Sequence, residues 1–234
     1  MSAPHFIFML TRDDRTAPNA EDLAEQALQA GVRHIGFKDV GLPWSRLSAL
    51  ARRLAEAGVE TYLEVVSLDV ERERESIAAG VDLGVRNLLG GVHAEAAADA
   101  LAGANLAYYP FAGDIRGHPS VLAGEPAATV SDARRLCELG HVAGVDLLAY
   151  RGAVDGGELA VQVCAALGKP VIVAGSIDCP QRIRAVAAAG AHAFTIGTAV
   201  LEGRFHPDSD STAAQLRAVA AILADLDATR PRRE

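Results

Sequence analysis

A lysine and a glutamate on two successive apolar segments are the residues of this chain best suited to chemistry. Lys38 stands in residues 36–39 (GFKD), and Glu64 stands in residues 63–65 (LEV). Because successive side chains of a strand point to opposite faces, Lys38 and Glu64 can share one interior face. A lysine between apolar residues and beside a carboxylate can polarise a carbonyl oxygen, donate a proton or form an imine, while the carboxylate moves a proton. The alternative is a buried structural ion pair that ties two strands together.

Two further apolar segments, late in the chain, each end in glycine followed by a small hydroxyl residue. They are residues 171–176 (VIVAGS) and 193–198 (AFTIGT). This form is typical of a buried parallel strand that opens into a loop whose backbone amides can approach an anion. The pair predicts a phosphate site at Gly175, Ser176, Gly197 and Thr198. The alternative is that both glycines only form turns.

These residues need a scaffold, and the chain alternates apolar segments with amphipathic stretches, as parallel strands crossed by helices do. Its 234 residues, 50% of them hydrophobic, can bury the core of one barrel domain. We expect strands at residues 5–10, 32–38, 60–66, 86–89, 105–111, 145–150, 170–174 and 193–196. That number suits a closed barrel, so we predict an α/β fold. The expected fold is a single (β/α)8 TIM-barrel domain over residues 1–234, with a frayed tail at 228–234.

Helices are expected between the strands, several of them followed by glycine, which helix C-termini prefer. The expected ranges are 20–30, 43–57, 68–79, 131–139, 180–189 and 211–226, with a short extra helix at 198–205. One long segment, residues 112–127, lacks regular alternation and contains several glycines together with Arg116 and His118. We expect it to close over the substrate with these two side chains reaching inward. The alternative is that it contacts a neighbouring subunit.

The two glycine loops resemble the phosphate site of the ribulose-phosphate-binding barrels, a superfamily of sugar-phosphate isomerases, epimerases and related lyases. In (β/α)8 barrels this site is commonly built by the loops after the seventh and eighth strands and by the N-terminus of a short extra helix, for which residues 198–205 have the right length. The resemblance covers most of the chain in architecture, but its motif is confined to the two loops. It implies a metabolic enzyme acting on a phosphorylated sugar-like or carbonyl compound.

Lys38 and Glu64 narrow the expected reaction. Residues 36–39 are similar to the Lys-Asp pair of Schiff-base pyruvate lyases, but those enzymes carry the lysine on a late strand, so no catalytic residue is transferred from them. Aminosugar-phosphate 2-epimerases use a lysine and a carboxylate as paired acid and base, which is compatible with Lys38 and Glu64. We therefore expect an isomerase or epimerase that works by enolisation. The alternatives are a lyase or aldolase with Lys38 as covalent amine, and a non-catalytic barrel that binds phosphate ligands.

Other strand ends complete the candidate site, because a barrel places its active site at the carboxyl ends of its strands. We expect Asp13 as a third catalytic group, and as substrate-binding groups Arg12, Asp39, His118, Tyr150 and Arg151. Alternatives remain for several of them. Arg12 and Asp13 could pair with each other, His118 could be an ordinary loop histidine, and Arg151 could pair with Asp155.

Net charge and composition limit the kinds of partner that the chain can bind. A net charge of -8 argues against nucleic acid, since a phosphate-backbone binder normally needs a basic face. No basic leader and no apolar run of membrane-spanning length is found, so we expect a cytoplasmic protein. The three cysteines match no zinc pattern, and no Asp/Glu cluster demands Mg²⁺. We expect no metal and no cofactor, a phosphorylated small molecule as partner, and a chain compatible with homo-oligomer formation.

Overall fold

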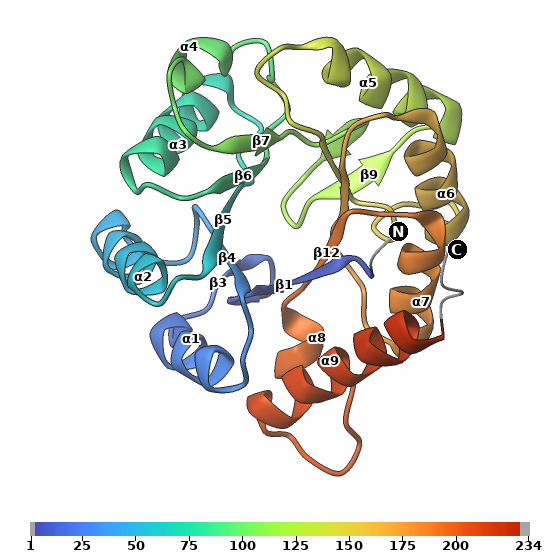
Figure 1. The fold of residues 1–234 in the computed structure, drawn as a ribbon. Helices are drawn as coiled ribbons and strands as arrows, with labels where there is room; N and C mark the ends of the chain where they lie inside the picture. Colours follow the sequence, from blue (N-terminus) through green and yellow to red (C-terminus); the bar gives the residue numbers. More distant parts are fainter. Residues whose placement is uncertain (1–2, 230–234) are drawn as a thin grey trace.

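The computed structural model describes residues 3–229, which form a closed barrel of parallel strands surrounded by helices (Figure 1). The strand order is β10-β11-β12-β1-β4-β5-β6-β7. The strands are β1 (His5–Met9), β4 (His34–Lys38), β5 (Glu60–Val65), β6 (Asn87–Gly90), β7 (Ala107–Tyr109), β10 (Val145–Leu147), β11 (Val171–Val173) and β12 (Ala193–Ile196). Each of the expected segments forms one of these strands, and the predicted single-domain TIM barrel is confirmed. Of the expected frayed tail, residues 230–234 lie outside the described residues.

The barrel closes between β7 and β10. Phe111 forms a parallel bridge with Asp146. The Asp146 amide donates to the Pro110 carbonyl at 2.9 Å, and the Ala112 amide donates to the Asp146 carbonyl at 3.0 Å. With this seam closed, the carboxyl ends of all the barrel strands meet at one mouth, where barrels place their chemistry.

Helices cover the outside of the barrel (Figure 1). They are α1 (Ala20–Gln29), α2 (Trp44–Glu56), α3 (Val70–Asp82), α4 (Ala98–Leu101), α5 (Pro126–Glu138), α6 (Gly156–Ala166), α7 (Pro180–Ala189), α8 (Thr198–Leu201) and α9 (Thr212–Ala228). All of the expected helices are present. However, α5 begins at a proline five positions before the expected start, because proline suits the first turn of a helix. The short extra helix α8 ends at Leu201, earlier than expected. None of the helices described is both long and apolar enough to span a membrane.

The expected irregular segment 112–127 is instead mostly ordered. It contains the antiparallel pair β8 (Asp114–Arg116) and β9 (Val121–Ala123), and its last residues already belong to α5. A second small hairpin, β2 (Thr11–Arg12) with β3 (Arg15–Thr16), follows β1. Both hairpins rise from strand ends at the mouth of the barrel, where insertions can reach a site.

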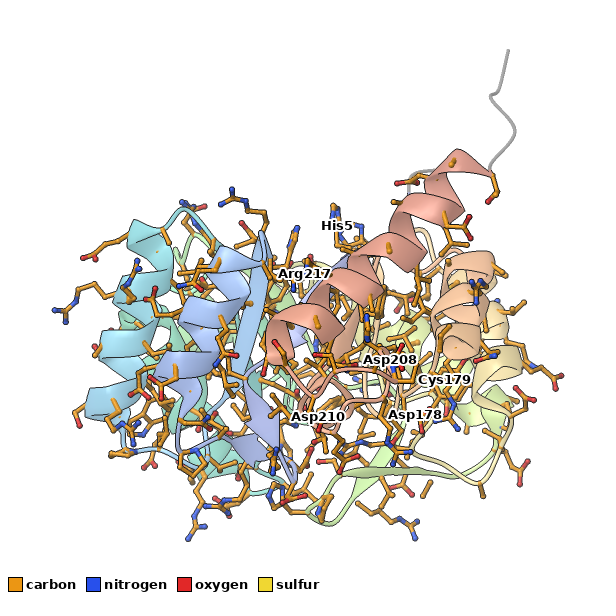
Figure 2. The ribbon with its side chains drawn as sticks, turned by 90° about the horizontal axis from the view of Figure 1, so that it is seen from below. His5, Asp178, Cys179, Asp208, Asp210 and Arg217 are labelled. Carbon is orange, nitrogen blue, oxygen red and sulfur yellow. The ribbon has the colours of Figure 1, made fainter. Side chains whose placement is uncertain are left out.

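Strand alternation divides the core into two parts. One cluster lies between the strands and the helices, and a smaller cluster fills the barrel interior, with Ile7, Met9, Tyr62, Leu89, Tyr109, Ile172 and Ala193. Three histidines gather where these strands begin: the ring of His5 lies 4.6 Å from that of His34 and 5.3 Å from that of His192. In the side view of Figure 2, His5 lies at the end of the barrel opposite Asp178, which lies toward the mouth.

Candidate active site

Lys38 lies at the end of β4, directly opposite Glu64 on β5. Its Nζ donates to Glu64 Oε1 at 2.6 Å and to Asp14 Oδ1 at 2.8 Å. All three side chains are nearly inaccessible to solvent, with exposed fractions of 5% for Lys38, 5% for Glu64 and 1% for Asp14. The expected adjacency of Lys38 and Glu64 is therefore present, and a second carboxylate joins it.

Asp14 is the central residue that the sequence did not single out. It sits in the two-residue turn between β2 and β3, where Asp13 and Asp14 have φ of 51° and 62°. Such left-handed pairs are typical of tight hairpin turns, and aspartate tolerates them. The two successive aspartates were visible in the sequence, but only Asp14 binds Lys38. Sequence reasoning chose Asp13, whereas the structure places Asp14 on the ammonium.

The charge state of this cluster follows from its contacts. Burial alone would lower the pKa of Lys38, but the carboxylates of Glu64 and Asp14 outweigh it and raise that pKa above its usual value. For Asp14, burial acts to raise the pKa, yet Lys38 and Arg151 lower it to about 2. Arg151 donates to Asp14 Oδ1 at 2.8 Å. Lys38 is thus an ammonium ion and Asp14 a carboxylate at neutral pH.

The ion cluster and the two glycine loops line one cavity of 300 Å³ at the mouth. Its lining includes seven of the predicted catalytic and phosphate-binding residues and one predicted substrate-binding residue: Asp13, Lys38, Glu64, Gly175, Ser176, Gly197, Thr198 and Arg151. Asp14, Asp178, Glu202 and Arg204 also contribute. Residues far apart in the sequence therefore meet here, since the cavity is bounded by ends of early and late strands.

The backbone of both glycine loops is available to an anion. Gly175 and Ser176 have φ of 77° and 54°, so two successive residues take the left-handed conformation after β11. Gly197 precedes α8, whose first amides have no acceptor within the helix. Amides of this kind attract anions because their N–H groups carry partial positive charge.

Packing also requires glycine at position 197. A Cβ added there would lie 2.3 Å from Thr11 Oγ1 and 3.0 Å from the Thr11 carbonyl oxygen. A Gly197→Val substitution would therefore disturb the fold as well as any anion site, because its side chain would crowd Thr11 and the backbone after β1. The same crowding explains glycine at this position without any ligand.

Four of the predicted substrate-binding residues lie outside this cavity. Arg12 donates to the Leu201 carbonyl, Asp39 accepts from the Val66 amide, and Tyr150 lies beneath the Arg182 guanidinium. His118 Nδ1 lies 3.5 Å from Asp14 Oδ2, so His118 contacts the ion cluster without lining the cavity. Arg151 does not pair with Asp155, because Asp155 caps α6 by accepting from the amides of Gly157 and Glu158.

The β8–β9 hairpin lies against the mouth. At its tip Pro119 lines the cavity, the Ser120 amide donates to Asp14 Oδ2 at 3.2 Å, and Arg151 donates to the Ser120 carbonyl at 3.3 Å. Arg116 does not reach inward as expected: its side chain is 69% exposed and pairs with Asp114. Alternation along β8 explains this, because buried Ile115 takes the inner face.

Buried Asp146 is a further ionisable group that the sequence reasoning missed. It lies in the middle of β10, inside the expected strand 145–150, and has no exposed surface. An aspartate between Val145 and Leu147 was the available signal, because charge is rare inside a barrel strand. No cluster of three His, Cys, Asp or Glu residues within residues 3–229 has the arrangement of a metal site.

Comparisons with known proteins identify the fold and no closer relationship. No protein-family model and no curated protein matches the sequence. The native KDPGal structure matches with 14% identity over 96% of this chain and 97% of that chain, at a TM-score of 0.67. The tryptophan synthase alpha-subunit of Pyrococcus furiosus matches with 13% identity, 96% and 100% coverage and a TM-score of 0.69.

A third match is BexX in the Amycolatopsis orientalis BexX/CysO complex, with 18% identity, 99% and 94% coverage and a TM-score of 0.62. These neighbours are TIM-barrel enzymes. At such low identity the likeness shows the fold alone: the chain is a TIM barrel distantly similar to these enzymes.

Proposed function

We propose that this chain is an isomerase or epimerase that enolises a small phosphorylated carbonyl or sugar-like compound. This proposal is carried by one observation: a single cavity is lined both by a buried ammonium ion between two carboxylates and by the two glycine loops. Its volume of 300 Å³ is at the low end for ligand pockets, which suits a small substrate.

The anion-binding part of the proposal is supported by another loop of the same chain. After β6, the amides of Val92 and His93 each donate to the carboxylate of Glu73 at 2.9 Å. This loop also begins with glycine, Gly91, at a φ of 77°. Successive amides after a left-handed glycine therefore bind an anion in this barrel. After β11 the corresponding residues, Ser176 and Ile177, border the cavity and can receive the phosphate of a ligand.

The reacting part would lie over Lys38 and Glu64. The ammonium polarises the carbonyl oxygen, and Glu64 takes the proton from the neighbouring carbon, so the electrons of that C–H bond move into the enolate. Returning the proton to the former carbonyl carbon, while the proton of the neighbouring hydroxyl group moves to the former carbonyl oxygen, gives an isomer. Returning the proton to the opposite face of the original carbon gives an epimer. The lyase alternative is less well supported, because an imine-forming lysine must lose its proton, and Glu64 and Asp14 raise the pKa of Lys38.

The test is proton exchange with solvent. A panel of aldose and ketose monophosphates is incubated with the protein in deuterated water, and loss of a C–H signal next to the carbonyl is followed by NMR. A Glu64→Gln variant should slow this exchange by about 10²–10⁴-fold, the usual contribution of a positioned base. The matched control is Glu60→Gln, at the other end of the same strand, where the side chain binds Asn87.

Two outcomes would decide against enolisation. A borohydride-stable adduct on Lys38 would establish the imine-forming lyase. Saturable binding of a phosphate ester without exchange or product would establish a non-catalytic ligand-binding barrel.

The phosphate position is tested separately. Thr198→Asp would place a carboxylate of the chain at the first turn of α8, as Glu73 does after β6, and should abolish binding of phosphate esters. Thr212→Asp is the matched control, since Thr212 begins α9 away from the cavity. Equal affinity in both variants would place the anion site elsewhere.

A further inference from the structure

Asp146 is a buried carboxyl group that forms no hydrogen bond with any residue in the described part of the chain. Its side chain points into the barrel, because Val145 and Leu147 on either side belong to the cluster that faces the helices. It has no exposed surface, and neither carboxylate oxygen has a hydrogen-bond partner among the described residues. An isolated ionised carboxylate in such a place is costly, so the group must be neutralised or paired.

Within residues 3–229, the surroundings of Asp146 offer no cation that is not already paired. Ile172 on β11 stands directly beside Asp146, and the neighbouring strand β7 presents Tyr109 to the same interior, where burial raises the pKa of the phenol. The charged groups that act on Asp146 are Glu64 from β5, Lys38 from β4 and Arg151 from the segment after β10. Both of these cations already bind Asp14, and Lys38 also binds Glu64.

The charges of this cluster balance only if Asp146 is neutral. Lys38 and Arg151 carry two positive charges, and Asp14 and Glu64 carry two negative charges. A fifth ionised group would leave one negative charge uncompensated beneath the cavity. Burial first, and then the negative charge of Glu64, raise the pKa of Asp146 well above its usual value, while Lys38 and Arg151 only partly oppose this.

We propose that Asp146 holds a proton at neutral pH and is a positioning residue that keeps the Lys38–Glu64 pair electrically balanced. Ionisation of Asp146 at higher pH would add a negative charge below the mouth. That charge would weaken binding of an anionic ligand and strengthen the hold of Lys38 on its proton. The protonation of Asp146 stands on its own, whereas the effect on phosphate esters rests on the proposed function.

The direct test uses the unmodified protein with aspartate labelled with ¹³C at Cγ, titrated by NMR. One aspartate carboxyl should remain protonated at pH 7, and its resonance should be missing in Asp146→Asn. The matched control, Asp132→Asn, removes an aspartate that binds Arg135 at the surface and should leave that resonance in place. A spectrum in which every aspartate is ionised by pH 6 would overturn the proposal without any variant.

Coupling to the active pair is tested by two neighbours. Glu64→Gln removes the negative charge that raises the pKa of Asp146 and should therefore lower that pKa. Lys38→Met removes a positive charge and should raise it. If the Asp146 titration is the same in both variants as in the wild type, Asp146 is not electrostatically coupled to the Lys38–Glu64 pair, and the positioning role is refuted.

A ligand readout separates this inference from the proposed function. The affinity for a monophosphate ester should fall in the wild type as pH rises through the Asp146 titration, and should stay constant over that range in Asp146→Asn. An unchanged pH dependence in the variant would refute the electrostatic role. If neither protein binds any phosphate ester, the proposed function fails, while the NMR titration still decides whether Asp146 is protonated.

Discussion

Replacing Lys38 by methionine should destabilise the fold strongly. The methionine keeps most of the aliphatic volume, so the main change is the loss of a buried ammonium ion that holds Glu64 at 2.6 Å and Asp14 at 2.8 Å. Asp14 retains Arg151 and the Ser120 amide, but Glu64 is left without a cation. Removing one partner of a buried ion pair typically costs about 3–5 kcal/mol. Because Asp14 stays paired, we expect a value near the lower limit, about 3 kcal/mol.

For a chain of this size such a loss corresponds to a decrease of the melting temperature by roughly 6–12 °C. Urea unfolding at pH 7.5 measures it. The double variant Lys38→Met with Glu64→Gln should recover much of the stability, since it removes the unpaired charge. Wild-type stability of the single variant at pH 7.5, or no recovery in the double variant, would refute the assigned geometry.

Three other outcomes are expected. Burial lowers the pKa of His34 and His192, and the charge of His5 lowers it further. Below pH 6.5 the unfolded chain therefore takes up more protons than the folded chain, and the free energy of unfolding decreases. His34→Gln should reduce this loss of stability in acid, as measured by urea unfolding. Glu73→Ala should cost about 1–3 kcal/mol in the same assay, because it leaves the amides of Val92 and His93 without their acceptor; a neutral result would mean that water replaces it. In hydrogen exchange, a phosphate ester should protect residues 114–123 at any protein concentration, whereas protection that follows protein concentration alone would identify a subunit contact.

The fold and the central ion pair could be predicted because both depend on short periodicities. Alternation with period two places Lys38 and Glu64 on one face of adjacent strands, and the register that pairs them follows from parallel strands of matched length. The strand–helix alternation gives the barrel. Helix ends were predicted less well: Pro126 begins α5 inside a segment whose glycines suggested a loop.

The rest of the site depends on tertiary contacts with no local signature. Asp14 receives Lys38, Arg151 and the Ser120 amide from segments 24, 137 and 106 positions away. Nothing in the Asp-Asp turn tells which carboxylate points inward, because φ is positive at both residues. Likewise, Tyr150 and Asp39 follow barrel strands as site residues do, but their side chains pack away from the cavity.

The glycine motif shows why a sequence pattern alone could not establish an anion site. At Gly197 the absence of a side chain is already required by Thr11, at 2.3 Å from where a Cβ would stand, so this glycine would be needed in an empty barrel. At Gly175 the nearest atoms to an added Cβ would belong to the side chain of Arg151, and the residues that follow this left-handed glycine, Ser176 and Ile177, line the cavity. An anion site is therefore indicated mainly by Gly175 and Ser176 and by the comparable loop that binds Glu73. A carboxylate placed in either loop, as in Thr198→Asp, should prevent the binding of phosphate esters, because both loops line the same cavity.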